Sequence, residues 1–384
     1  MRARMFTQIG RDAVSALGRE LAAWKPTPER ALFGVEAVIS VVLSVALAHL
    51  LHLPYTWWAA ISGFAVMQTR FSASAQRALH RVLGTILGGL LGTLLGPVIG
   101  DRPWLFVPVL GVIGAICVYR GNGSSASYAW VLGGITWVLV TFEAHKLIAF
   151  GPTASFAMLR VAEVCVGTFA CLLVSGAFHV GISWYERRWP ASKVVAAAAA
   201  TANAPPPTFE TLRHARMVLG VQAGIAVAIL AALTVTLDLP GFAQALVTTI
   251  AVMILPPTSV VVRSQKPVAD KMVQRMVGCL IAGAVGLALL PLMQGQVVPS
   301  LLALAAGIWA GCHVQTGKEG ASYIGRQFTI AFIMVFVQDH AWSADPHAAM
   351  LRLAGILTGI AILTCVMLVA SRLSFLPVSE EATP

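Results

Sequence analysis

The sequence predicts an all-α polytopic membrane protein with about twelve transmembrane helices, arranged as two parallel six-helix repeats. Three observations support this: an apolar composition, a long internal repeat, and basic residues confined to alternate connections. Of the 384 residues, 58% are hydrophobic and 11% are charged, and the mean hydropathy is +0.80. Soluble domains carry about 25% charged residues, so the composition excludes a soluble enzyme or a disordered regulator. A net charge of +10 does not indicate nucleic-acid binding, because Lys and Arg form short clusters between apolar runs.

The internal repeat is visible as residue patterns that recur at a nearly constant spacing. Arg30-Ala-Leu-Phe-Gly-Val-Glu-Ala recurs as Arg216-Met-Val-Leu-Gly-Val-Gln-Ala, a spacing of 216 − 30 = 186 residues, and Leu53-Pro54 recurs as Leu239-Pro240 at the same spacing. Later pairs have spacings between 192 and 195 residues: Arg81 with Arg275, Tyr128 with Tyr323, and Arg160 with Arg352. The sequence therefore indicates that one ancestral unit was duplicated.

Each unit contains six apolar segments. In the first unit they are 31–51, 55–69, 82–100, 103–119, 127–149 and 154–181, and in the second 217–237, 241–255, 274–293, 297–314, 321–338 and 348–370. A spanning helix needs about 20 residues, so most segments qualify. The second segment of each unit is short, which leaves a re-entrant loop as the alternative.

The distribution of basic residues decides between these alternatives. With twelve crossings and the N-terminus inside, all Lys and Arg lie on the inner side except Arg102, Lys146, Arg160 and Arg352, which leaves 26 − 4 = 22 inside. Re-entrant second segments would move two basic clusters outward, against the positive-inside rule. Twelve crossings with both termini cytosolic are therefore predicted. Because six is even, the units run in parallel about a pseudo-two-fold axis along the membrane normal.

The same patterns predict five parts along the chain. Residues 1–29 form an amphipathic cytosolic helix, because apolar side chains recur there at helical spacing among arginines. Residues 30–182 form the first membrane unit and 213–371 the second. An Ala/Pro-rich cytosolic linker, 183–212, joins them, and 372–384 form a cytosolic tail.

Arg160 and Arg352 are the first candidate substrate-binding residues, since each lies some way into the sixth helix of its unit. A charge at membrane depth costs about 2.5–3.5 kcal/mol on insertion scales, so it usually faces protein or water. Glu163 follows Arg160 by three residues on the same helix face and is expected to pair with it, whereas Gly355 stands at the equivalent place. Two interpretations stay open: a structural ion pair, or an anion site in which Arg352 is the unpaired, stronger attractor.

Two carboxylates are candidates for proton coupling. Glu36 lies in the first apolar segment, and Glu163 is the partner expected for Arg160. Buried carboxylates in membrane segments mark proton relays in many transporters. The neutral Gln222 at the place equivalent to Glu36 leaves a simple hydrogen bond to a neighbouring helix as the alternative.

Four further residues are candidates with structural alternatives. Arg81 and Arg275 begin the third helix of each unit and either gather anions at the inner mouth or extend to lipid headgroups. Trp130 and Trp137 either stack on an aromatic substrate or belong to an interfacial aromatic belt.

The sequence predicts no enzyme, no metal and no cofactor. The six cysteines lie in apolar runs without CxxC or Cys/His spacing. P-loop, kinase, GxSxG and HExxH motifs are missing, so transport driven by ATP binding to this chain is not expected.

The duplicated Arg-x-x-x-Gly-Val-Glu/Gln-Ala opening, the Leu-Pro before a short second helix, and the Arg-x-x-Gly start of a glycine-rich third helix resemble the fusaric acid resistance (FUSC) family. The resemblance covers about 30–181 and 213–370. This family includes the aromatic acid exporters of bacterial inner membranes, and its membrane unit is similar to that of plant aluminium-activated malate transporters.

The resemblance implies a multi-pass inner-membrane secondary transporter. It would export small organic anions, fusaric-acid-like or hydroxybenzoate-like aromatic carboxylic acids, driven by the proton gradient. Implied partners are the lipid bilayer, a periplasmic adaptor protein and an outer-membrane channel, with no nucleic acid. The alternatives are a passive organic-anion channel of the malate-transporter type and a non-transporting membrane scaffold.

Overall fold

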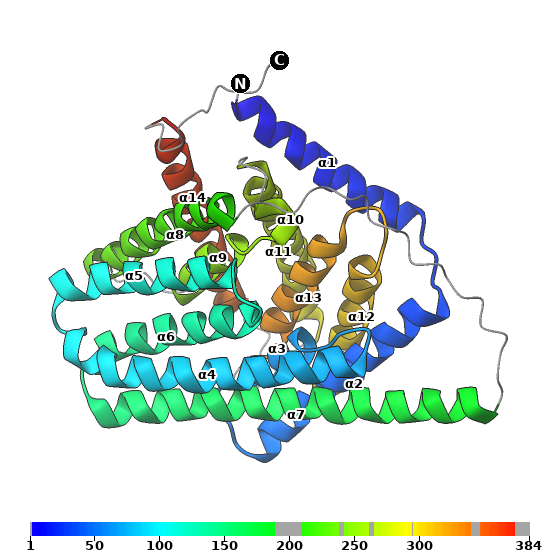
Figure 1. The fold of residues 1–384 in the computed structure, drawn as a ribbon. Coiled ribbons are helices and arrows are strands. Elements are labelled where there is room, and N and C mark those ends of the chain that lie inside the picture. Colours follow the sequence, from blue (N-terminus) through cyan, green and yellow to red (C-terminus); the bar gives the residue numbers. More distant parts are fainter. Residues whose placement is uncertain are drawn as a thin grey trace.

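The computed structural model consists of helices and their connections (Figure 1). It describes residues 2–188, 209–237, 242–260, 265–293, 295–338 and 346–372. Residues 189–208 of the predicted linker and 373–384 of the predicted tail lie outside these ranges. All regular elements in the described ranges are helices: α1 (Arg2–Ala22), α2 (Pro28–Leu50), α3 (Thr56–Ala65), α4 (Phe71–Ile99), α5 (Pro103–Gly121), α6 (Ser127–Leu147), α7 (Phe150–Arg188), α8 (Phe209–Leu237), α9 (Phe242–Val252), α10 (Pro257–Val260), α11 (Lys266–Met293), α12 (Val297–Gln315), α13 (Ser322–Phe336) and α14 (His347–Arg372). The all-helical prediction is confirmed.

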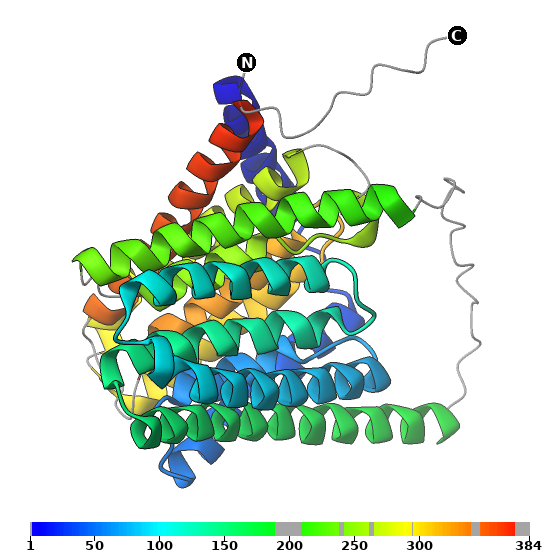
Figure 2. The ribbon, with the colours of Figure 1, turned by 60° about the vertical axis from the view of Figure 1, so that its left-hand side comes forward.

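Eight of the described helices are long and apolar enough to cross a membrane: α2, α4, α5, α7, α8, α11, α12 and α14. The chain is therefore a multi-pass membrane protein. Figure 2 shows α8, α5, α6, α4 and α7 stacked side by side in that order, which is also the order of their mutual contacts.

The other four apolar segments form α3, α6, α9 and α13. The shortest, α3, has 10 residues and is about 15 Å long, half the roughly 30 Å of a bilayer core. Nine of its residues are buried, and it packs against α2, α7 and α13. Protein rather than lipid surrounds this helix, so it needs neither the length nor the uniform hydropathy of a lipid-facing span.

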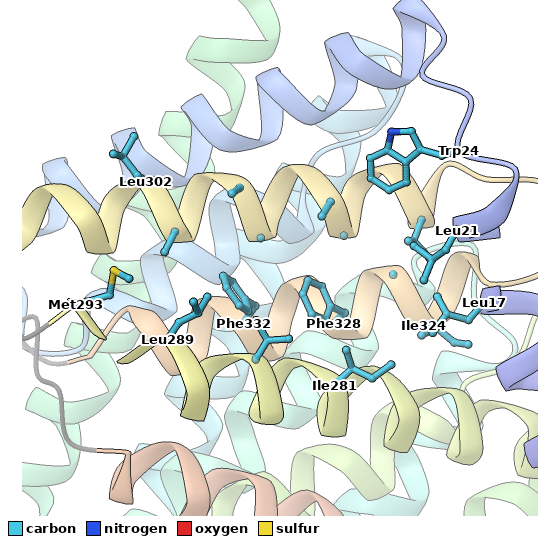
Figure 3. A pocket seen from close by; sticks show the side chains of 18 of the residues that line it. Leu17, Leu21, Trp24, Ile281, Leu289, Met293, Leu302, Ile324, Phe328 and Phe332 are labelled. Carbon is cyan, nitrogen blue, oxygen red and sulfur yellow. The ribbon is translucent and has the colours of Figure 1, made fainter. Parts of the chain in front are cut away.

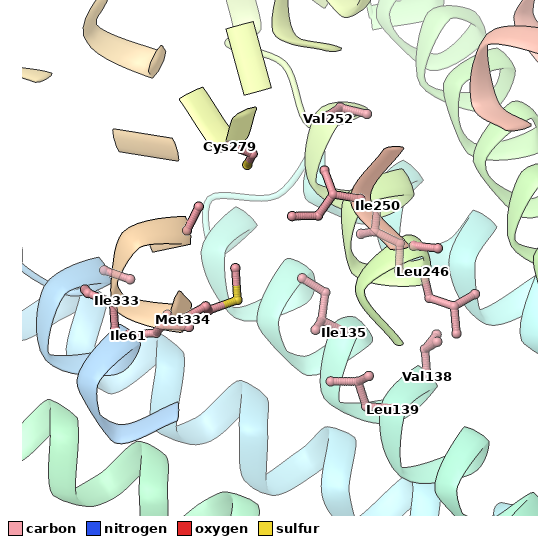
Figure 4. Close-up of a cluster of buried hydrophobic side chains, with 14 of the residues drawn as sticks. Ile61, Ile135, Val138, Leu139, Leu246, Ile250, Val252, Cys279, Ile333 and Met334 are labelled. Atoms are coloured by element: carbon pink, nitrogen blue, oxygen red, sulfur yellow. The ribbon is translucent and has the colours of Figure 1, made fainter. Parts of the chain in front are cut away.

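The two halves of the chain contact each other reciprocally. Helix α5 packs along α8 and α12 packs along α2, while α6 contacts α9 and α13 contacts α3. Since α2, α3, α5 and α6 align in sequence with α8, α9, α12 and α13, each contact has a counterpart. Figure 4 shows the apolar part of these contacts. Leu139 of α6 and Leu246 of α9 belong to the same cluster of buried side chains, and in it Ile61 of α3 lies beside Ile333 of α13.

The glycine stripe of α4 allows an unusually close approach to α6. A Cβ on Gly88 would lie 2.1 Å from the carbonyl oxygen of Gly133, and one on Gly92 would lie 2.7 Å from Val140. Gly286 of α11 stands in the same relation to Val335 of α13, at 2.4 Å. These helices can therefore pack backbone to backbone, as small-residue stripes permit in membranes.

We expect Gly88→Ala to destabilise the protein by about 1–3 kcal/mol, because the new methyl group must push two backbones apart. The measurement is the thermal unfolding midpoint of the purified protein in detergent. Gly181→Ala is the matched control, since nothing lies within 4 Å of a Cβ at Gly181. An unchanged midpoint for the Gly88 variant would show that the contact between α4 and α6 is looser than described.

The N-terminal helix α1 docks onto the second half of the chain. Its Ile9 and Ala13 pack with apolar residues of α11, α12 and α13. At its end, the buried Glu20 accepts a 2.5 Å hydrogen bond from Nη2 of Arg30 and a 3.1 Å bond from the backbone N–H of Glu319. Burial alone raises the pKa of Glu20, but these hydrogen bonds outweigh it and hold the pKa below its usual value. The apolar packing and the hydrogen bonds of Glu20 therefore attach the amphipathic helix α1 to the rest of the protein.

Candidate functional site

A cavity of about 580 Å³ lies between the two halves of the chain. Its walls come from α3, α4 and α6 and from their counterparts α9, α11 and α13. The cationic side chains that line it are Arg77, Arg81, Lys271, Arg275 and Arg326, and its described lining contains neither Asp nor Glu. No group of three or more His, Cys, Asp or Glu side chains that could hold a metal occurs in the described part of the chain. The cavity therefore offers positive charge to an anion rather than ligands to a metal.

A second cavity, of about 700 Å³, lies between α11, α12 and α13 and the end of α1. Figure 3 shows its side chains, among them Trp24, Phe328 and Phe332, and none of the lining residues is charged. It offers no counter-charge to an anion, so the cationic cavity is the candidate site.

Arg81 and Arg275 are the buried cations of this site, and each is held by neutral partners. Arg81 donates from Nε to Oγ of Ser62 (3.1 Å) and from Nη1 to the hydroxyl of Tyr128 (3.0 Å). Arg275 donates from Nη2 to Oγ1 of Thr248, at 3.2 Å. Ser62 and Thr248 occupy equivalent places, since 248 − 62 = 186. Both arginines are thus oriented by hydroxyl groups that leave their charges available to a ligand.

Arg275 also donates a 2.6 Å hydrogen bond from Nη1 to Oε1 of Gln327. Its Nε has no hydrogen-bond partner among the described residues. Because charge-assisted hydrogen bonds to carboxylates are among the strongest in proteins, this unused donor is suited to a carboxylate oxygen.

The remaining cations surround this pair. The guanidinium of Arg77 lies 4.4 Å from the ring centre of Tyr128, and Nζ of Lys271 lies 5.2 Å from that of Tyr323. Arg326 donates to the carbonyl oxygen of Ala65, the last residue of α3, at 3.4 Å. Cations at the end of a short helix are stabilised by its unpaired carbonyls, which favours the charged form of Arg326 in the cavity wall.

Two stacked indoles form one end of the cavity. The rings of Trp57 and Trp58 lie 4.1 Å apart at 29°. The guanidinium of Arg160 lies 3.4 Å from the ring centre of Trp58, and that of Arg352 lies 4.5 Å from Trp57. We refer to these four side chains as the tryptophan–arginine cluster. At the opposite end the lining includes Gln68 and Ser125, which lie in connections between helices.

The predicted pairing of Arg160 with Glu163 is confirmed. Nη1 of Arg160 lies 3.3 Å from Oε2 of Glu163, with 4% and 0% of the two side chains exposed. Arg352 is not the unpaired residue that the sequence led us to expect, because it donates to the carbonyl oxygen of Met334 as well as contacting Trp57. Backbone and aromatic partners take the place of the missing carboxylate at Gly355.

Residues 30–204 match the model of the Fusaric acid resistance protein family, and residues 258–366 match that described as Fusaric acid resistance protein-like. The chain belongs to the fusaric acid resistance protein family. The two matches fall on the two halves that contact each other reciprocally. No curated protein and no solved structure gives a significant match to the chain.

In this FUSC protein the predicted site residues divide into three groups. Arg81 and Arg275 line the cavity, where the sequence had placed them only at its mouth. Arg160 and Arg352 lie behind the indoles at its end rather than in its described lining. Their role as substrate ligands stays a prediction.

Trp130, Trp137 and Glu36 lie outside the described lining of this cavity. Trp130 is 38% exposed and lies under the guanidinium of Arg120, while Trp137 lies where α4 meets α6. Glu36 accepts a hydrogen bond from the hydroxyl of Ser175 on α7. Their predicted roles in ring stacking and proton coupling are not tested by these positions.

Sequence reasoning missed the aromatic part of the FUSC cavity. Tyr128 and Tyr323 recur in the two halves as Ala-Ser-Tyr, at the starts of α6 and α13, and this repeat was the available signal. Trp57 and Trp58 gave no such signal, since tryptophans at a helix end are also typical of an interfacial belt.

Proposed function

We propose that the protein is a secondary transporter that exports small organic anions, in particular aromatic carboxylic acids, across the bacterial inner membrane, driven by the proton gradient. The observation that carries this proposal is the cavity between the two halves, with five cationic side chains and no Asp or Glu in its described lining. Cations held in a cavity, two of them buried as Arg81 and Arg275 are, attract a carboxylate more strongly than they would in bulk water.

The aromatic preference is supported by the rings around these cations. Trp57, Trp58, Tyr128 and Tyr323 all line the cavity, and aromatic rings prefer to stack on other rings in offset or edge-on geometry. Since cations or a neighbouring indole already cover faces of these rings, an aromatic anion would contact mainly their edges, and an aliphatic anion would make fewer such contacts.

For the topology we propose twelve crossings in two parallel units with both termini cytosolic. The reciprocal contacts between the halves support the duplication. Because α3, α6, α9 and α13 line the cavity, they are surrounded by protein and water, where short and polar membrane segments are tolerated. In this topology the end of the cavity at Gln68 and Ser125 faces the cytosol, and the tryptophan–arginine cluster closes the periplasmic end.

Because the side chains of the tryptophan–arginine cluster pack against one another at this end, we favour an alternating-access exporter over a passive channel, which needs a continuous path. A periplasmic adaptor protein and an outer-membrane channel are proposed as partners for onward export.

Flux through purified protein in liposomes tests the function. With a pH gradient imposed, we expect radiolabelled benzoate to accumulate beyond the level in protein-free liposomes, and this excess to be lost when a protonophore is added. Downhill flow that only follows the voltage would assign a channel instead. No flux above empty liposomes, from protein that remains folded, would contradict any transport role and leave the scaffold.

Glu36 is the proposed proton carrier to test first, because Gln222 supplies a natural replacement at the equivalent place. We expect Glu36→Gln to abolish accumulation while downhill exchange continues, since the amide keeps the hydrogen bond with Ser175 but carries no titratable proton. Accumulation at the wild-type rate would return Glu36 to the role of an interhelical hydrogen-bond acceptor.

A further inference from the structure

We propose that the indole N–H of Trp57 determines substrate specificity, by donating a hydrogen bond to a second polar group of an anion whose carboxylate is bound by Arg81 and Arg275. This inference rests on the proposed function and adds the chemistry of the preferred substrate. The expected ligand is an elongated anion with a carboxylate at one end and a hydrogen-bond acceptor at the other.

The first support is an unused donor in the cavity. Trp57 lines the cavity and is 7% exposed, and its Nε1 has no hydrogen-bond partner among the described residues. Nε of Arg275, a residue that lines the same cavity, also has no hydrogen-bond partner among the described residues. Buried donors in native proteins are nearly always paired, and leaving one unpaired costs free energy. Both donors are buried atoms of residues that line one cationic cavity, so we infer that a ligand bound there supplies their missing acceptors.

The second support is the rigidity of the donor. The ring of Trp57 stacks on Trp58 at 4.1 Å and lies 4.5 Å from the guanidinium of Arg352. Trp58 is in turn covered by Arg160, which Glu163 holds through the ion pair. The indole is therefore fixed by its neighbours and cannot easily rotate to find an acceptor within the protein.

The third support is the spacing along α3 between Trp57 and Ser62, the residue that anchors Arg81. Arg81 and Arg275 are anchored at Ser62 of α3 and at its counterpart Thr248 of α9. Ser62 follows Trp57 by five residues on the same helix, which is about 7.5 Å along its axis. A benzoate with a polar para substituent has comparable length between its two ends. A benzoate without one reaches the arginines alone.

Two ligands of nearly equal size provide the test: 4-hydroxybenzoate and 4-methylbenzoate, titrated calorimetrically into the full-length protein. We expect the wild type to bind the hydroxyl compound about five- to tenfold more tightly, as one additional buried hydrogen bond would give. In Trp57→Phe this preference should disappear, because a phenyl ring has no N–H to donate, and any loss of ring contacts affects the two compounds alike. Trp104→Phe is the control, since Trp104 is 72% exposed and outside the described lining.

The comparison of ligands on the wild type needs no substitution, so it tests the proposal even if Trp57→Phe does not fold. Equal affinities of the wild type for both compounds would overturn the proposal while leaving anion transport in place. A preference that persists in Trp57→Phe would also overturn the proposal. An equal loss of affinity for both compounds in this variant would overturn it too, because it would indicate that Trp57 acts by ring stacking. Binding of neither compound by the wild type would reject the proposed function itself.

Discussion

The double substitution Arg81→Gln with Arg275→Gln is expected to abolish anion binding and transport, with at least a hundredfold loss of affinity for benzoate. Each arginine would give the carboxylate a charge-assisted hydrogen bond worth about 1.5–3 kcal/mol. Losing both costs about 3–6 kcal/mol, and every 1.4 kcal/mol corresponds to a factor of ten. The measurement is calorimetric titration of benzoate, with transport into liposomes as the functional readout.

The symmetry of the cavity extends this prediction to the two single variants. Arg81 and Arg275 bind equivalent hydroxyls, Ser62 and Thr248, so the two single variants should each lose affinity by a similar factor. Arg120→Gln is the matched control, because Arg120 lies over the exposed ring of Trp130 and outside the described lining. A double variant that folds and still binds benzoate as the wild type does would remove these residues from the site.

The position of these two arginines also shows where the sequence was sufficient and where it was not. Apolar segments beginning at 82 and 274 predicted that Arg81 and Arg275 stand at helix starts. In the structure α4 begins at Phe71 and α11 at Lys266, so both arginines lie well inside their helices. The N-terminal parts of α4 and α11 carry the cavity-lining Arg77, Arg81, Lys271 and Arg275, and their polar residues excluded them from the spans predicted by hydropathy.

The spacing of residues within one helix, by contrast, correctly predicted the features that depend only on neighbouring turns of that helix. The three-residue spacing of Arg160 and Glu163 predicted their ion pair, and the four-residue spacing of Gly84, Gly88 and Gly92 predicted close helix packing. The cavity brings together segments about 190 residues apart, and one sequence does not determine which faces meet there. For this reason the sequence indicated Trp130 as a candidate for the substrate site and did not indicate Trp57.

The second large effect is expected at the Arg160–Glu163 pair. Glu163→Gln should destabilise the protein by about 3–5 kcal/mol, because removing one partner of a buried pair leaves the other charge without its counter-ion. The exposed fractions of 4% and 0% leave little access for water to replace the lost carboxylate. Glu163 also accepts the backbone N–H of Tyr55 at 3.2 Å, next to the start of α3. We expect the thermal midpoint in detergent to fall and Trp57 and Trp58 to become less ordered.

A double-mutant cycle separates this structural role from proton coupling. Replacing both Arg160 and Glu163 with Met removes the two charges together, and such replacements of buried pairs are often neutral or stabilising. If the pair only supports the tryptophan–arginine cluster, the double variant should recover most of the stability lost in Glu163→Gln and should keep gradient-driven export. If Glu163 carries the proton, the double variant should fold and still fail to accumulate substrate, because its only remaining response would be downhill exchange. A single Glu163→Gln variant as stable as the wild type would contradict the structural role, since it would mean that Arg160 does not depend on its carboxylate partner.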